Sequence, residues 1–154
     1  MTSKFGSWHA GCLTFTPPSH LSVAQIRALL DEDGWNITFS GSADLVVKAG
    51  NWLPAGDAQK FTALTPADLA LLDGLKAMRN FPAHRSTSSR SAMNAALTAL
   101  ANHPPLAPLA KNGAREVHSL GKHLRALAPG GMGATRLDVL LRELKLLIAK
   151  VRRR

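Results

Sequence analysis

Apolar residues recur at every third or fourth position over most of this chain, which is the period of an amphipathic helix. The first such segment starts at Ser22, which opens a Ser-x-x-Gln capping box, and stops at Gly34, a residue suited to the end of a helix. The apolar positions 23, 26, 29 and 30 lie between them at helical spacing. The pattern therefore predicts a helix over residues 22–33.

Residues 36–53 fit two different structures. The segments Ile37-Thr38-Phe39 and Leu45-Val46-Val47 flank three small residues, an arrangement typical of a β-hairpin. Residues 43–53 equally suit a short helix. The pattern favours the helix and leaves the hairpin open.

The next helix has the clearest start. Thr65 supplies an N-cap hydroxyl, Pro66 suits the first helical position, and Asp68 places an acid at the positive end of the helix dipole. Apolar residues follow at positions 71, 75 and 78. Because proline disfavours helical backbone at the residue before it, we expect the helix to end or kink near Asn80, ahead of Pro82.

Three more helices are predicted further along the chain. Serines at 86, 88, 89 and 91 lead into one with Met93, Leu97 and Leu100 on its apolar face, closed by a proline-rich linker over 103–108. The other two helices are predicted over residues 114–128 and 135–152. In the second of these, some apolar residues lie off the main apolar stripe, which indicates that more than one face of the helix is covered.

The predicted fold class is therefore all-α, a bundle of about five helices. At 154 residues the chain has the length of a single domain, with residues 1–20 expected as an irregular arm and 152–154 as a basic tail. Cys12 is the only cysteine, so no internal disulfide and no paired-cysteine zinc pattern is possible. With no signal-like start and no long apolar run, we expect a cytoplasmic protein without a membrane span.

The formal net charge of +9 is concentrated towards the C-terminus. Residues 1–64 hold 4 Lys/Arg against 5 Asp/Glu, residues 65–112 hold 5 against 2, and residues 113–154 hold 10 against 3. Such a field attracts polyanions, with RNA or DNA first and acidic proteins or anionic lipids behind them. The alternative is a basic surface that serves only solubility.

One stretch carries residues suited to phosphodiester chemistry. Arg79 can hold a phosphate bidentately, a histidine such as His84 can move a proton near neutral pH, and Asn80 can orient either of them or a ribose hydroxyl. These residues suit metal-free cleavage, and we expect neither a metal nor another cofactor. The structural alternative is an arginine favoured at a helix C-terminus and a histidine in a turn or cap.

A second cluster follows immediately. Arg85, Ser86, Ser89 and Arg90 run into a helix N-terminus, where free backbone N–H groups and the dipole favour an anion, so we predict RNA-backbone contacts there. Serines at this position equally serve as N-caps. His118 and His123 are five residues apart, which predicts surface or phosphate-facing roles instead of a shared metal.

The string around Arg79, Asn80 and His84 resembles the HEPN family of helical RNases and RNA-binding domains, whose motif is an arginine, usually followed by a polar residue, with a histidine four to six residues beyond. The likeness covers about residues 71–100. It implies a homodimeric helical bundle that cuts RNA by 2′-hydroxyl attack, with His84 as general acid/base, Arg79 on the scissile phosphate and Asn80 positioning.

The same resemblance implies a toxin or defence effector, with a cognate antitoxin or a nucleotidyltransferase as partner. Two alternatives from other classes stay open. One is a non-catalytic RNA- or DNA-binding module whose basic surface comes from residues 114–128 and 135–152. The other is a helical interaction module that packs the apolar stripe of residues 137–151 against another protein.

Overall fold

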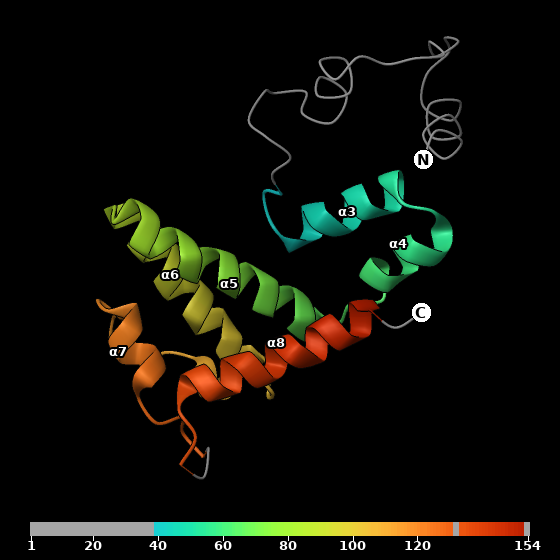
Figure 1. The fold of residues 1–154 in the computed structure, drawn as a ribbon. Coiled ribbons are helices and arrows are strands. Elements are labelled where there is room, and N and C mark those ends of the chain that lie inside the picture. Colours follow the sequence, from blue (N-terminus) through green and yellow to red (C-terminus); the bar gives the residue numbers. More distant parts are fainter. Residues whose placement is uncertain (1–38, 131–132, 153–154) are drawn as a thin grey trace. The chain divides into compact units, whose positions relative to one another are not determined.

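The computed structural model describes residues 39–130 and 133–152, and in these segments the chain is all-α (Figure 1). The predicted helix over 22–33 and the predicted arm over 1–20 lie outside the described residues, as do residues 153 and 154 of the basic tail. The chain divides after Thr62 into two compact units. That both units form one domain stays a prediction.

The described part of the first unit is a pair of packed helices, α3 (Ser42–Trp52) and α4 (Ala55–Thr62). The helix favoured for residues 43–53 is therefore confirmed, and no hairpin forms there. Asp44 accepts the backbone N–H of Ser40 at 2.8 Å, which lowers the pKa of that carboxyl and fixes the start of α3. The sequence did not predict α4, because this segment has no apolar stripe. Ala58 is the one buried residue of the helix.

The second unit contains four α-helices within its described residues: α5 (Pro66–His84), α6 (Thr87–Ala99), α7 (Leu120–Arg125) and α8 (Arg136–Arg152). Two short 3₁₀ turns, Leu100–Asn102 and Ala107–Leu109, follow α6 in the proline-rich segment. The helices α5 and α6 pack side by side as a hairpin, and α8 packs on the same core (Figure 1).

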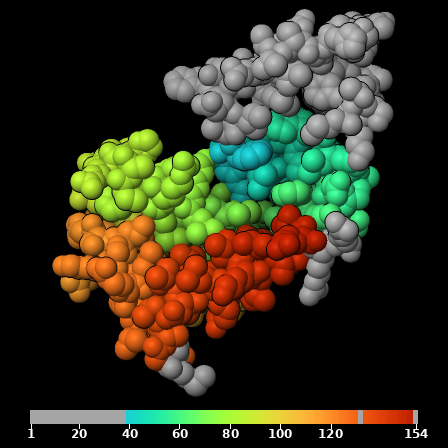
Figure 2. Space-filling view, viewed as in Figure 1, coloured from blue at the N-terminus to red at the C-terminus, as the bar shows by residue number. Residues whose placement is uncertain are grey.

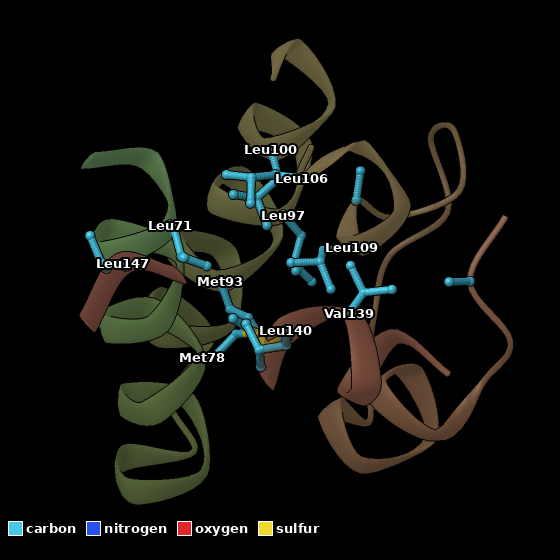
Figure 3. Packing of buried hydrophobic residues seen from close by; sticks show 12 residues of the cluster. Leu71, Met78, Met93, Leu97, Leu100, Leu106, Leu109, Val139, Leu140 and Leu147 are labelled. Atoms are coloured by element: carbon cyan, nitrogen blue, oxygen red, sulfur yellow. The ribbon is translucent and has the colours of Figure 1, made fainter. Parts of the chain in front are cut away.

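The core of this unit comes largely from the stripes that periodicity predicted. Leu71, Met78, Met93, Leu97 and Leu140 are buried and gather between α5, α6 and α8 (Figure 3). Leu106 and Leu109 complete it from the proline-rich segment. The shared core fixes the ends of α5 and α6 relative to each other, which positions the site described below.

The expected end of α5 near Asn80 was wrong, because the helix passes through Pro82 and continues to His84. Proline lacks the N–H that would bond to the carbonyl four residues earlier. At Pro82 this loss falls in the last turn, and the helix still closes with the Arg85 N–H donated to the Phe81 carbonyl at 2.8 Å. The proline therefore removes one bond without stopping the helix.

The helix predicted over 114–128 was also wrong in extent, because only Leu120–Arg125 is helical. Asn94 of α6 binds both backbone polar groups of Val117, so the chain there cannot use those groups in a helical ladder. After α7, Leu127 and Thr135 form an isolated antiparallel bridge. Tertiary hydrogen bonds thus replace the local helix on both sides of α7.

The helix α8 lies on the face that Figure 2 shows in red. Several of its apolar side chains are exposed. Leu137, Leu141, Leu146 and Ile148 are between 39% and 53% exposed, although Leu140 and Leu147 are buried. The helix α8 therefore has apolar side chains on the face that packs against the core of its own unit and also outside that face. The sequence shows the same feature as apolar positions off the main stripe.

Candidate functional site

The site forms where α5 turns into α6 through only two residues. Arg85 ends α5 in the left-handed conformation, with φ of 49°, and Ser86 caps α6. The Ser86 hydroxyl accepts the Ser89 N–H at 3.1 Å, and the Ser89 hydroxyl accepts the Ser86 N–H at 3.1 Å. This reciprocal capping box sets the direction in which α6 leaves the turn.

A groove of about 520 Å³ opens beside this turn, and we name it the α5–α7 groove. Its walls are Phe81, Pro82 and Arg85 from the end of α5, Ser86, Thr87 and Arg90 from the start of α6, and His118 to Gly121 at the start of α7. The volume lies within the range of about 300–1,000 Å³ that is usual for small-ligand pockets.

The electrostatics of the α5–α7 groove favour an anion. Its walls carry two guanidinium groups and an imidazole, from Arg85, Arg90 and His118, and no carboxylate. The first backbone N–H groups of α6, at Thr87 and Ser88, have no acceptor inside the helix. Among the residues that line the groove, a bound phosphate would find two guanidinium groups, one imidazole and, at Thr87, a backbone N–H at the start of α6.

The side chains of Arg136 and His123 hold the wall formed by α7 through partly buried hydrogen bonds. The guanidinium of Arg136, which is 3% exposed, donates to the Leu127 carbonyl at 3.0 Å and to Asn112 Oδ1 at 2.9 Å. His123 Nε2 lies 3.0 Å from the Leu109 carbonyl oxygen. Burial lowers the pKa of His123 and the positive charge of Arg136 adds to this, while the bond to Leu109 opposes it.

The HEPN-like residues lie next to the groove and not in its walls. Arg79, Asn80 and His84 occupy the last two turns of α5, with Arg79 and His84 exposed and Asn80 half-buried. Asn80 and His84 are one turn apart and share a face, whereas Arg79 and His84 are rotated by about 140° around the axis. A single copy of the chain therefore does not direct Arg79 and His84 to the same point.

The structure brings together most of the second predicted cluster, the residues expected to contact the RNA backbone. Arg85, Ser86 and Arg90 all line the α5–α7 groove, while the hydroxyl of Ser89 is used in the capping box. His118 also lines the groove, away from His123. The sequence offered no spacing that connects His118 with Arg85 or Arg90, because the three meet only through the packing of α6 against the segment before α7.

Within the described part of the chain, no group of three or more His, Cys, Asp or Glu side chains is arranged to hold a metal ion. None of the described helices combines the length and apolar character that crossing a membrane requires. No family model, curated protein or solved structure matches the chain.

Proposed function

We propose that the second unit binds single-stranded RNA by holding a backbone phosphate in the α5–α7 groove. The observation that carries this proposal is the convergence of Arg85, Arg90 and His118 around one groove without a carboxylate. Guanidinium groups bind phosphate oxygens bidentately, and such contacts supply most of the affinity of sequence-independent binding.

The apolar part of the groove favours a single strand over a duplex. Phe81, Pro82 and Leu120 lie beside the cationic residues, and Phe81 is only half-buried. An unpaired base can stack on an aromatic side chain next to a bound phosphate, which a base inside a duplex cannot do. The groove volume of about 520 Å³ suits one nucleotide unit of a strand.

The proposal is tested by fluorescence anisotropy with a labelled single-stranded RNA at several salt concentrations. We expect the double variant Arg85→Ala, Arg90→Ala to lose at least about tenfold in affinity. The slope of log K against log salt should fall by about 0.7 for each RNA phosphate that the variant no longer neutralises. Labelled duplex RNA, run in parallel, should bind more weakly, because its bases are not free to stack in the groove.

A charge-matched control separates the groove from general surface charge. Lys145 and Arg152 are exposed on α8 and are not in the groove walls, so the variant Lys145→Ala, Arg152→Ala removes the same charge elsewhere. We expect it to bind RNA nearly as the wild type does. An equal loss of affinity in both double variants would show that net charge, and not the groove, binds the RNA.

We propose metal-independent RNA cleavage of the HEPN type as a second candidate function. The observation in its favour is that α5 stays helical through Pro82, so Arg79, Asn80 and His84 lie on one rigid helix that ends at the groove residue Arg85. Because Arg79 and His84 point in different directions, a second copy is needed to complete the site. The exposed leucines of α8 offer a surface for such a dimer.

In this reaction the ribose 2′-oxygen attacks phosphorus and forms a 2′,3′-cyclic phosphate, while the bond to the 5′-oxygen breaks. His84 of one copy accepts the 2′-hydroxyl proton, and a second acid returns a proton to the leaving 5′-oxygen. Arg79 stabilises the charge that develops on the phosphate oxygens. No electrons are transferred, so the step requires no redox partner.

Incubation of the purified protein with mixed RNA in EDTA tests the cleavage proposal. We expect fragments with 2′,3′-cyclic phosphate ends from the wild type and a loss of roughly 100-fold or more in rate for His84→Ala. His103→Ala serves as the control, because His103 is outside the groove and outside the motif. Sedimentation of the same samples reports whether the active species is a dimer. RNA binding without cleavage by the wild type would leave only the first proposal.

A further inference from the structure

His118 joins the α5–α7 groove from a part of the chain remote from Arg85 and Arg90 in sequence. We infer that His118 is a phosphate-contacting residue of this groove and that buried Asn94 is the residue that positions it. The inference rests on the proposed RNA binding and adds a contact and a positioning residue to it.

The link between Asn94 and the segment before α7 is a paired set of hydrogen bonds. The Val117 N–H donates to Asn94 Oδ1 at 2.7 Å, and Asn94 Nδ2 donates to the Val117 carbonyl at 3.2 Å. The side-chain amide thus satisfies both backbone groups of one residue, as a neighbouring strand would. Asn94 is only 6% exposed, so water does not compete with these bonds.

The same amide ties the segment before α7 to the groove wall. Asn94 Nδ2 also donates to the Arg90 carbonyl at 3.1 Å, and Arg90 lies one turn before Asn94 on α6. A single buried side chain therefore connects the backbone of Arg90 with the backbone next to His118. Both of these residues line the groove.

The position of His118 depends on the anchoring of Val117. The Val117 side chain packs against the core, and the chain bends at the next residue, His118. The His118 side chain is exposed and lines the groove, where a ligand can reach it.

This lining lets a phosphate be held by groups from two parts of the chain. Arg85 and Arg90 contact it from the turn between α5 and α6, and the imidazole N–H of His118 donates from the segment before α7. A third donor from a separate segment fixes the position of a phosphate better than the two arginines alone. We expect the third donor to contribute roughly a three- to tenfold gain in affinity.

The experiment measures binding of a labelled single-stranded RNA by His118→Ala, Asn94→Ala and the double variant. We expect the two single variants to bind roughly three to ten times more weakly than the wild type. The double variant should bind no more weakly than His118→Ala alone, because Asn94 acts through His118. His103→Ala, the matched histidine control, should bind as the wild type does.

Outcomes that overturn the inference are distinct from those that overturn the proposed function. If the Arg85 and Arg90 variant loses affinity while His118→Ala does not, RNA binds in the groove without His118 and the inference fails alone. If Asn94→Ala weakens binding further in the His118→Ala background, Asn94 supports the whole unit and is not a positioning residue for His118. If the wild type binds no RNA, the proposed function and the inference fail together.

A spectroscopic readout keeps the test independent of folding defects. The His118 ring resonances in the full chain should shift on titration with a single-stranded hexanucleotide RNA, and those of His103 should not. In folded Asn94→Ala, the His118 shift should shrink while amide shifts at Ser86 and Thr87 persist. Unchanged His118 resonances at saturating RNA would exclude contact between this side chain and the ligand.

Discussion

Arg85→Gly is expected to stabilise the fold relative to Arg85→Ala by about 1 kcal/mol, although both variants should bind RNA roughly tenfold more weakly than the wild type. The reason is the backbone at this position, where φ is 49° and a side chain with a Cβ is strained. Both variants lose the same guanidinium from the groove. The strain that glycine relieves at this position exceeds the extra backbone entropy that glycine loses on folding.

Urea unfolding and RNA anisotropy on the same three proteins check this prediction. The left-handed residue at the end of α5 is one of only a few positions in the described chain with positive φ, and the others there are Gly113, Gly130 and Gly133. An arginine at a position that glycine prefers strains the turn, and the proposed phosphate contact gives a reason for a cation there. Equal stability of the two variants would contradict the strained turn, and wild-type affinity in both would remove Arg85 from the binding site.

Asp68→Asn is expected to lower the free energy of unfolding at pH 7 by about 1–2 kcal/mol. Asp68 is buried and accepts the Thr65 N–H at 2.9 Å, the Thr65 hydroxyl at 2.7 Å and the Lys150 ammonium at 2.7 and 2.8 Å. The carboxylate thus caps α5 and joins its start to the end of α8. Asparagine keeps the shape, and its amide oxygen can still accept from Thr65, but it loses the negative charge that strengthens the cap and pairs with Lys150.

The effect of this substitution should depend on pH. Burial of Asp68 opposes its ionisation, but the hydrogen bonds from Lys150 and Thr65 outweigh it, so the pKa in the folded protein lies below the ordinary value of 3.8. The stability that Asp68 supplies is therefore complete above that ordinary value. It is lost as the pH falls through the lower, folded-state value, where the carboxylate becomes protonated. Urea unfolding between pH 7 and about pH 2 should show a constant difference between the wild type and Asp68→Asn above pH 3.8 and convergence of the two below it.

The capping box of α8 provides a matched control. Asp138 accepts the Thr135 N–H at 2.8 Å and the Thr135 hydroxyl at 2.6 Å, as Asp68 does with Thr65, but no lysine binds it within the described chain. The Thr135 hydroxyl and N–H bonds lower the pKa of Asp138. Asp138→Asn should therefore cost less than Asp68→Asn, and the difference should shrink in about 1 M salt. Equal costs in both variants would show that the Lys150 contact contributes nothing.

Local signals in the sequence predicted the second unit well. The Thr65 cap, the apolar stripes through Leu71, Met78 and Leu97, and the long C-terminal helix were all confirmed. Caps and stripes arise from interactions between residues three or four positions apart, so the sequence displays them directly. The same local reasoning assigned Arg85, Ser86 and Arg90 to one cluster, and the structure places these three in one groove.

Local reasoning failed where distant contacts outweigh local preference. Pro82 was expected to end or kink α5 near Asn80, but α5 continues to His84, because only one backbone bond is lost there and the turn to α6 is fixed by core packing. The segment before α7 has the apolar spacing of a helix, but Val117 bonds to Asn94 instead. No pattern in either segment shows its partner, because the pairing depends on how α6 lies against the rest of the unit.

The sequence by itself determined the helical class, the starts of the main helices, most of the core positions and the basic character of the C-terminal part. Only the tertiary structure decided that His118 meets Arg85 and Arg90, and that α5 is joined to α8. The bonds responsible span 23 residues from Asn94 to Val117 and 82 residues from Asp68 to Lys150. Contacts at such separations form only when packing has already brought the helices together, since closing the intervening chain costs entropy that local signals do not report.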